Sequence, residues 1–431
     1  MEAKRSKYLD KLISKKHNGR IKIISGLRRS GKSYLLFELF YRHLRNVGID
    51  DSHILKLALD ESSNAKYRNP MELEKYVREN ISNDEAMHYV FLDEIQFVRS
   101  IPNPWLPGTD EQIGFVDVLL GLMKIKNLDI YVTGCNSKML SKNIVTQFRD
   151  RGNVIEVHPL SFVEFYEAFS GDKSKTWLEF RTYGGLPNIL HLNSHEEKSE
   201  YLKNLFHSTY LKDVVERNYL HADVEKLSDL LNVVASSVGS LTNPSKLSNT
   251  FKSMKNQKVS SATLAKYLDF FEDTFILSKA HRFDVKGKKY LSSPLKYYFN
   301  DIGLRNALLN FRQQEEPHIM ENILFNELKI RGYDVDVGIV EYNYKQESKS
   351  MRKQLEIDFV VNKSDKRVYI QSALTINDPK KMIQESESLK RVHDNFQKII
   401  ITKDETYPWH TDDGTLIINL QDFLLNSKRI L

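Results

Sequence analysis

The feature that most constrains this chain is a glycine-rich segment, GLRRSGKS, at Gly26–Ser33. An apolar run at Ile21–Ile24 precedes it, and an apolar-periodic stretch at Tyr34–Leu44 follows it. The segment fits the pattern G-x-x-x-x-G-K-[ST], in which a loop joins a strand to a helix and its backbone N–H groups surround phosphates. It therefore predicts a nucleotide-binding α/β domain.

Four positions of this loop carry the chemistry that the pattern needs. Gly26 and Gly31 allow tight turns and a close approach of the backbone to the β-phosphate. We expect Lys32 between the β- and γ-phosphates of ATP, and we expect the Ser33 hydroxyl to bind Mg²⁺. The other loop residues, expected to line the same site, are Leu27, Arg28, Arg29 and Ser30.

Two acids follow a second apolar run, YVFLDEIQ, in which Tyr89–Leu92 precede Asp93 and Glu94. A carboxylate at the carboxyl end of a buried strand holds a nucleotide-bound Mg²⁺, and we assign this role to Asp93. We expect Glu94 to orient and deprotonate the attacking water. The alternative is a solvated acid pair at the start of a loop, but a phosphate loop about 60 residues upstream favours the catalytic role.

A third apolar run, IYVTGCNSKML, ends in polar residues. A polar group there can contact the γ-phosphate or hold the attacking water, and Thr133 and Asn136 are both candidates. We include Asn136 among the catalytic residues. Turn chemistry also explains a polar strand end followed by Gly134, so this alternative stays open.

Short apolar runs alternate with helical patterns over the first 160 residues. Such runs suit strands buried on both faces of a parallel sheet, and the alternation predicts a layered α/β domain. The predicted strands are Ile21–Ser25, Ile54–Leu59, Tyr89–Leu92, Leu128–Val132 and Val154–Val157.

The length of the chain, 431 residues, predicts more than one domain. A single cysteine, Cys135, excludes an internal disulfide. The charged start and the lack of a long apolar window argue against a signal peptide and a membrane span, so we expect a cytoplasmic protein. A net charge of +6 permits a nucleic-acid partner without requiring one.

Six segments spread along the chain carry a family resemblance. They are GLRRSGKS, VFLDEIQ, VTGCNSKML, RDRGNVIEVHPLSFVEF, YGGLPNIL and YLKDVVERN. In this order they resemble the motifs of a prokaryotic AAA-type ATPase family, in which a winged helix and a nuclease-like C-terminal domain follow the ATPase domain. The resemblance implies an extra strand between the phosphate-loop strand and the Asp-Glu strand. It also implies that Arg149 or Arg151 neutralises charge on the γ-phosphate, in cis or in trans, although a solvated helix end explains these arginines equally well.

The patterns and the resemblance together predict four parts of the chain. Residues 1–160 are expected to form a P-loop AAA-type ATPase domain, a parallel sheet sandwiched by helices. Residues 161–241 are expected to form a helical linker or lid, and residues 242–310 a winged-helix domain, in which Ser260 caps the second helix. Residues 311–431 are expected to form a restriction-endonuclease-like α/β domain.

The predicted winged helix is rich in lysine and arginine. A helix-turn-helix with a basic wing can lay its second helix in the major groove of DNA. Against this, the second helix ends in Asp269, Glu272 and Asp273, which would repel phosphates, and a packing module is the alternative. The basic residues are Lys246, Lys252, Lys255, Lys258, Lys266, Arg282, Lys286, Lys288 and Lys289.

The C-terminal residues resemble a PD-(D/E)xK nuclease core that has lost catalytic groups. The helix carries Glu321 and Glu327, and the segment EIDFVV places Asp358 in a strand. Gln371 replaces the second acid and Ala373 the lysine, so we expect no nuclease activity.

The favoured function is an Mg²⁺-dependent ATPase switch that couples the nucleotide state to the C-terminal modules. ATP and Mg²⁺ are the expected ligands, DNA and a protein are candidate partners, no membrane contact is expected, and the oligomeric state is left open. The alternative from another class is an ATP-dependent nuclease of defence or mobile-element type. A third interpretation is a nucleotide-sensing interaction protein with little turnover.

Overall fold

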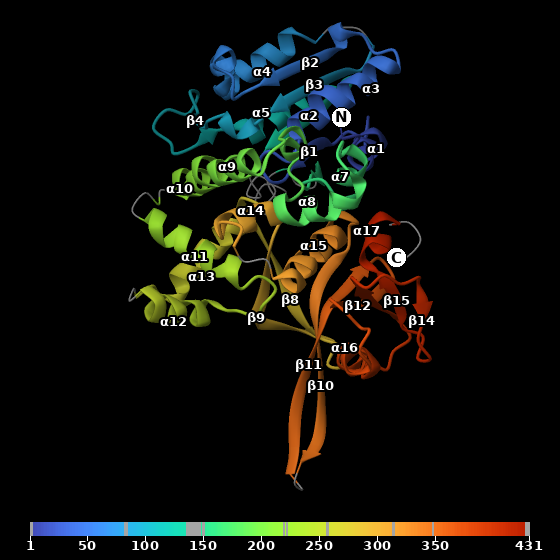
Figure 1. Cartoon of the computed structure of the whole chain (residues 1–431). Coiled ribbons are helices and arrows are strands. Elements are labelled where there is room, and N and C mark those ends of the chain that lie inside the picture. Colours follow the sequence, from blue (N-terminus) through green and yellow to red (C-terminus); the bar gives the residue numbers. More distant parts are fainter. Residues whose placement is uncertain are drawn as a thin grey trace. The chain divides into compact units, whose positions relative to one another are not determined.

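The computed structural model describes residues 3–81, 85–134, 148, 151–218, 220, 223–255, 258–312, 315–346 and 349–426 (Figure 1). Two compact units are present. The N-terminal unit comprises Glu2–Pro159 and Asp273–Phe275, and the C-terminal unit comprises Leu160–Glu272 and Ile276–Leu431. No helix in the described part of the chain is long and apolar enough to cross a membrane.

A five-stranded parallel sheet, counted over the described residues, forms the centre of the N-terminal unit. Its order is β2-β3-β6-β1-β7, so β6 lies between β1 and β3, as the family resemblance implied. All five predicted strands are present, and their ends differ by at most two residues. Their bounds are β1 Ile21–Ser25, β2 Ile54–Ala58, β3 His88–Asp93, β6 Leu128–Gly134 and β7 Gly152–Glu156.

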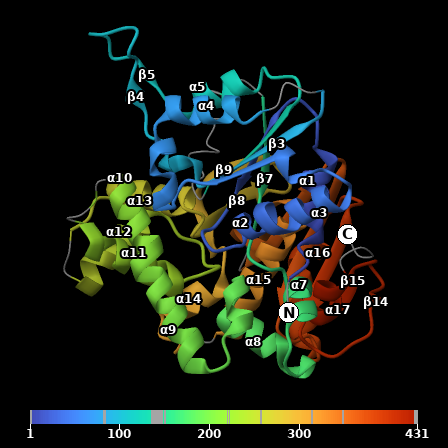
Figure 2. The ribbon, with the colours of Figure 1, turned by 90° about the horizontal axis from the view of Figure 1, so that it is seen from above.

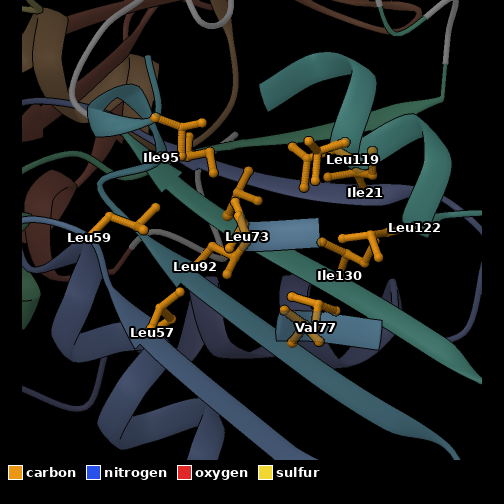
Figure 3. Close-up of a cluster of buried hydrophobic side chains, with 14 of the residues drawn as sticks. Ile21, Leu57, Leu59, Leu73, Val77, Leu92, Ile95, Leu119, Leu122 and Ile130 are labelled. Carbon is orange, nitrogen blue, oxygen red and sulfur yellow. The ribbon is translucent and has the colours of Figure 1, made fainter. Parts of the chain in front are cut away.

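Helices cover both faces of this sheet, as the two clusters of buried apolar side chains show. One cluster packs under α4 (Pro70–Glu79) and α5 (Phe115–Leu122), where Leu73 and Leu119 meet the sheet (Figure 3). The other packs under α1 (Ser6–Ser14) and the helical run that follows the phosphate loop. Successive residues of β1 point to opposite faces, because Ile23 belongs to the first cluster and Ile24 to the second.

The remaining elements of this unit are short. The helical run after the phosphate loop consists of α2 Lys32–Tyr34, the π-helical η1 Leu35–Phe40 and α3 Tyr41–Asn46. A two-stranded ribbon, β4 with β5, extends away from the sheet (Figures 1 and 2). The other bounds are α1 Ser6–Ser14, η2 Asp51–His53, η3 Ser62–Arg68, α4 Pro70–Glu79, η4 Ile95–Phe97, β4 Ile101–Pro102, β5 Gln112–Ile113 and α5 Phe115–Leu122.

The C-terminal unit begins with helices, as predicted for residues 161–241. Ser260 caps α13, since its hydroxyl accepts a hydrogen bond from the Thr263 N–H at 3.1 Å. The helical bounds are α7 Phe162–Ala168, η6 Lys173–Lys175, α8 Thr176–Tyr183, η7 Pro187–His191, α9 His195–Leu205, η8 Phe206–Leu211, α10 Lys212–Asn218, α11 Val224–Ser236, α12 Pro244–Lys255, α13 Ser261–Asp273, α14 Ile302–Leu308, α15 Glu316–Ile330, α16 Pro379–Lys390 and α17 Leu420–Leu425.

A mixed sheet, eight-stranded over the described residues, completes this unit in the order β14-β15-β13-β12-β11-β10-β8-β9. The strand pair predicted as a wing, β8 and β9, belongs to this sheet, because β8 pairs in parallel with β10 from Arg282 to Asp284. The bounds are β8 Leu277–Asp284, β9 Lys289–Phe299, β10 Asp334–Gln346, β11 Lys349–Lys363, β12 Lys366–Ala373, β13 Gln397–Thr402, β14 Trp409–His410 and β15 Leu416–Asn419.

The YGGLPN segment forms a tight turn against a buried carboxylate. Asp301 is 2% exposed and accepts hydrogen bonds from the Gly185 N–H at 2.8 Å and the Leu304 N–H at 3.1 Å. Burial raises the pKa of Asp301 to about 6, although these backbone donors lower it. Gly184 has a φ of 77°, and a Cβ atom there would lie 2.2 Å from the Asp301 Oδ1 atom.

This turn predicts a large cost for Gly184→Ala. The methyl group would collide with a carboxylate that its own hydrogen bonds hold in place, in addition to the strain of a positive φ. Gly332→Ala is the matched control, because its φ is 84° but its Cβ would meet only the Lys363 Nζ atom at 3.9 Å. We expect urea denaturation to show a loss of about 3 kcal/mol for Gly184→Ala and about 1 kcal/mol for Gly332→Ala. Equal losses would contradict this account.

Candidate functional site

The phosphate loop lies between β1 and the helical run that starts at Lys32. Gly26 has a φ of 135°, and a Cβ atom there would lie 2.1 Å from the Val157 carbonyl oxygen, so only glycine fits. The Lys32 side chain is 4% exposed, and its ammonium donates to the carbonyl oxygens of Gly26 and Leu27 at 3.0 Å each. The ammonium is therefore folded into the loop whose backbone would surround the phosphates.

The predicted acids stand at the carboxyl end of β3, beside this loop. Asp93 is 6% exposed, and its carboxylate accepts hydrogen bonds from the hydroxyls of Ser33 and Thr133. Burial raises the pKa of Asp93, and the two hydroxyls lower it without cancelling that rise. A hydroxyl and a carboxylate in contact form an oxygen set of the kind that Mg²⁺ prefers, so these residues fit the expected ion.

Thr133 joins the two acids. Its hydroxyl donates to Asp93 and accepts the Glu94 backbone N–H at 3.0 Å. Glu94 has a φ of 53°, a left-handed conformation that is uncommon outside glycine. Its carboxylate accepts a hydrogen bond from the Gln96 side chain. Thr133 thus fixes both the carboxylate of Asp93 and the backbone from which the Glu94 side chain leaves, a role that the sequence analysis did not identify.

A buried arginine that the sequence analysis missed contacts the phosphate loop. Arg5, just before α1, is 2% exposed, and its guanidinium donates to the carbonyl oxygens of Ser30, at 3.4 Å, and of His158. The guanidinium lies 4.5 Å from the ring centroid of Tyr8, whose hydroxyl accepts the His158 N–H at 3.2 Å. The spacing of Arg5, Tyr8 and Leu12 on one apolar helix face was the available signal.

Of the remaining predicted residues that the structure describes, Arg151 does not lie at this site. Arg151 is exposed and directly precedes β7, whose first residue pairs with Ile21, so it lies at the amino end of the parallel strands. The phosphate loop follows the carboxyl end of β1, which is about 16 Å away along five strand residues. Arg29 is exposed on the loop, and Arg28 is half-buried. Asn136 and Arg149 lie outside the described residues.

Two of the residues predicted for a nuclease-like core, Glu321 and Asp358, lie near a buried lysine, whereas a third, Glu327, pairs with Arg331 at 2.8 Å. Lys296 of β9 is 3% exposed and pairs with Glu321 at 2.8 Å and Glu356 at 2.7 Å. Burial lowers the pKa of Lys296, but the charges of Glu321, Asp358 and Glu356 outweigh it and raise that pKa above its ordinary value. Over the described stretches of the chain, no group of three or more acidic, histidine or cysteine side chains is arranged to hold a metal ion.

The two residues predicted to stand in place of nuclease catalytic groups lie on β12. Ala373 is 2% exposed, and Gln371 donates to Glu385 at 3.4 Å. The lysines nearest in sequence, Lys363 and Lys366, flank the turn between β11 and β12, and the Lys363 ammonium donates to the Arg331 carbonyl oxygen at 2.9 Å. The Lys363 ammonium is therefore bonded to the end of α15 in this structure.

Comparison with known proteins matches two parts of the chain to described families. Residues 18–166 match a family described as an AAA domain, and residues 174–315 match a domain of unknown function. An uncharacterized protein of Haemophilus influenzae is 34% identical over 427 residues, which cover 98% of both chains. An uncharacterized protein of Methanocaldococcus jannaschii is 28% identical over 444 residues, covering 98% of this chain and 91% of its own.

Solved structures with a similar arrangement include a Walker-type ATPase of Pyrococcus abyssi. Its TM-score is 0.49 at 16% identity, covering 71% of this chain and 95% of its own. The Orc1 protein of Aeropyrum pernix, solved in complex with DNA, has a TM-score of 0.33 at 14% identity, covering 74% of this chain and 94% of its own.

Proposed function

Because this chain belongs to a family of AAA-domain proteins, we propose that it binds Mg²⁺·ATP at Gly26–Ser33 and hydrolyses it with Glu94 as the general base. The observation that carries the proposal is the set of contacts at the carboxyl ends of β3 and β6. There, Ser33, Asp93 and Thr133 are joined by hydrogen bonds directly beside the phosphate loop.

Binding uses the loop and the lysine. The backbone N–H groups of the loop face the phosphates at the start of a helical run, where the helix dipole also favours negative charge. Lys32 exchanges its bonds to Gly26 and Leu27 for the β- and γ-phosphate oxygens. Ser33 and Asp93 would hold Mg²⁺, which would neutralise charge on the phosphates.

Hydrolysis uses the second acid. A water attacks the γ-phosphorus, its proton passes to the Glu94 carboxylate, and ADP leaves with the β–γ bond broken. Thr133 positions Glu94 through its backbone N–H. We assign Asn136 to holding the water. We assign Arg151 to neutralising γ-phosphate charge on a second copy of the chain, since it lies at the far end of its own sheet.

In this proposal, the C-terminal residues bind the partner whose contact depends on the nucleotide state. We propose a winged helix within residues 242–310 that contacts DNA or a protein, after a helical lid at 161–241. The exposed lysines of its hairpin, Lys286, Lys288 and Lys289, support a polyanion partner. Arg282 does not belong to this surface, because it is 8% exposed and donates to Gln354 at 3.3 Å.

The rival function, an ATP-dependent nuclease, requires a metal centre and a lysine aimed at the scissile phosphate. We propose that residues 311–431 form a nuclease-like domain that does not cut. Lys296 is buried and pairs with both Glu321 and Glu356, and this arrangement supports a structural role for the carboxylate cluster.

Two substitutions separate binding from chemistry. Lys32→Ala removes the cation that faces the phosphates, and we expect calorimetry to show strongly weakened ATP binding.

Glu94→Gln preserves the shape of the side chain but removes the base, so binding is retained while phosphate release falls about 10²-fold or more. Glu79→Gln, the same change at an exposed position of α4, is the control and keeps normal turnover. Normal turnover in Glu94→Gln would assign the base to another residue.

The bridge between the acids predicts a second effect on hydrolysis. Thr133→Val removes the hydroxyl that donates to the Asp93 carboxylate and accepts the Glu94 backbone N–H, so both groups lose this hydrogen-bond partner. Such a loss costs about 1–3 kcal/mol, so we expect the turnover number to fall roughly tenfold or more in steady-state assays. Thr133→Ser keeps the hydroxyl and is expected to stay close to the wild-type rate. Equal rates in the valine and serine variants would remove Thr133 from the mechanism.

The nuclease prediction is tested directly on the full chain. We expect no cleavage of single- or double-stranded DNA or RNA with ATP and either Mg²⁺ or Mn²⁺. Asp358→Ala serves as the control, with ATP hydrolysis as the measure of its folding. Cleavage by the wild-type chain that disappears in this variant would overturn the prediction and favour the ATP-dependent nuclease.

A further inference from the structure

The hairpin of β10 and β11 extends far beyond the sheet to which it belongs (Figure 1). The two strands pair from Asp334 with Asn362 out to Gln346 with Lys349. Among the described strands, β8 pairs with β10 only through Val337–Ile339, and β12 pairs with β11 only from Phe359 onward. The outer part, from Glu341–Gln346 to Lys349–Gln354, is therefore a two-stranded ribbon without a neighbouring strand, and we call it the arm.

The two faces of the arm differ in chemistry. Opposed residues of an antiparallel pair share a face, so Asn343 and Arg352 stand on one face with Glu341 and Gln354. Glu341 accepts bonds from both Arg352 and Gln354, and the Arg352 side chain is still 66% exposed. We call this the polar face, and its amide and guanidinium groups are the ones that bond base edges in DNA.

The opposite face is covered at its root. The Tyr342 ring lies 3.5 Å from the Arg391 guanidinium of α16, and its hydroxyl donates to Glu387 at 3.1 Å. Tyr344 continues this face, with its ring centroid 6.1 Å from that of Tyr342. These contacts anchor the arm to α16 and leave the polar face outward.

The sequence of the arm is basic. Between Glu341 and Gln354 it contains Lys345, Lys349, Arg352 and Lys353, against the acids Glu341 and Glu347. An isolated two-stranded ribbon is marginally stable in water, and its two unpaired edges are a liability for aggregation. Because the arm is basic and has no neighbouring strand, we expect it to contact a negatively charged partner.

We propose that the arm binds double-stranded DNA by placing its polar face in the major groove. A two-stranded ribbon fits a groove about 12 Å wide, and six residue pairs span about 20 Å, roughly two-thirds of a helical turn. Arg352 and Lys353 meet phosphates along the groove edges, while Asn343 and Gln354 face the base edges. This contact is independent of the proposed ATP hydrolysis and of the lysines on the β8–β9 hairpin.

The experiment measures binding of a fluorescein-labelled 24-base-pair duplex of mixed sequence to the full chain by anisotropy at several salt concentrations. The first variant replaces residues 342–353 by Asn-Gly, which closes the hairpin between Glu341 and Gln354. The second variant, Arg352→Glu with Lys353→Glu, keeps the arm and reverses two charges. Lys380→Glu with Lys381→Glu, at exposed positions of α16 in the same unit, is the control with the same change in net charge.

We expect the shortened arm to lower the affinity at least tenfold. The charge reversal should lower the slope of log Kd against log salt by about two, because each lost phosphate contact removes about 0.9. The α16 control should keep most of the wild-type slope, and ATP binding should be unchanged in every variant. Wild-type duplex affinity in the shortened arm would overturn the proposal. A change in molar mass by light scattering, with duplex binding intact, would instead assign the arm to contacts between copies of this chain.

Discussion

The alignment of three adjacent parallel strands is the constraint on which the candidate site depends. Pairing of β1 with β6 and of β6 with β3 brings the carboxyl ends of all three to one edge of the sheet. Ser33 follows the first end, Thr133 belongs to the second and Asp93 to the third. If β6 were shifted by one residue, the side chain at its end would point to the other face and the hydroxyl bridge would be lost.

The same sheet has a polar interaction in its interior that the apolar pattern does not suggest. Lys22 of β1 is fully buried and pairs with Asp129 of β6, whose carboxylate also accepts the Tyr131 hydroxyl at 2.8 Å. Burial lowers the pKa of Lys22 despite the opposing effect of Asp129. The pair lies near the amino ends of the strands, so the buried ion pair and the proposed phosphate site are at opposite ends of the parallel strands.

In the C-terminal unit, one sheet joins segments that the sequence divides. The hairpin assigned to a wing and the strands assigned to a nuclease-like domain share hydrogen bonds through β8 and β10. Lys296 of that hairpin is buried against Glu321 of α15 and Glu356 of β11. The sequence pattern changes at residue 310. In the structure, however, the segments before and after this residue share one sheet and are joined by the buried ion pairs of Lys296.

The local signals in the sequence determined the elements and the residue types of the site. Two local patterns predicted the site: glycines between a strand and a helix, and an acid pair after an apolar run. Both can be recognised from residues that are adjacent in the sequence. The apolar runs in turn predicted the five strands of the N-terminal sheet.

Only the tertiary structure decided which distant groups meet. Arg5 reaches Ser30 and His158, Thr133 bridges Asp93 and Glu94, and Lys296 takes a place among acids from two other elements. Arg151, although near these motifs in sequence order, lies at the opposite end of the strands, because strand direction fixes which end of each segment can meet another. A hydrogen bond or ion pair depends on distance in space, and sequence spacing determines that distance only within a single helix, strand or turn.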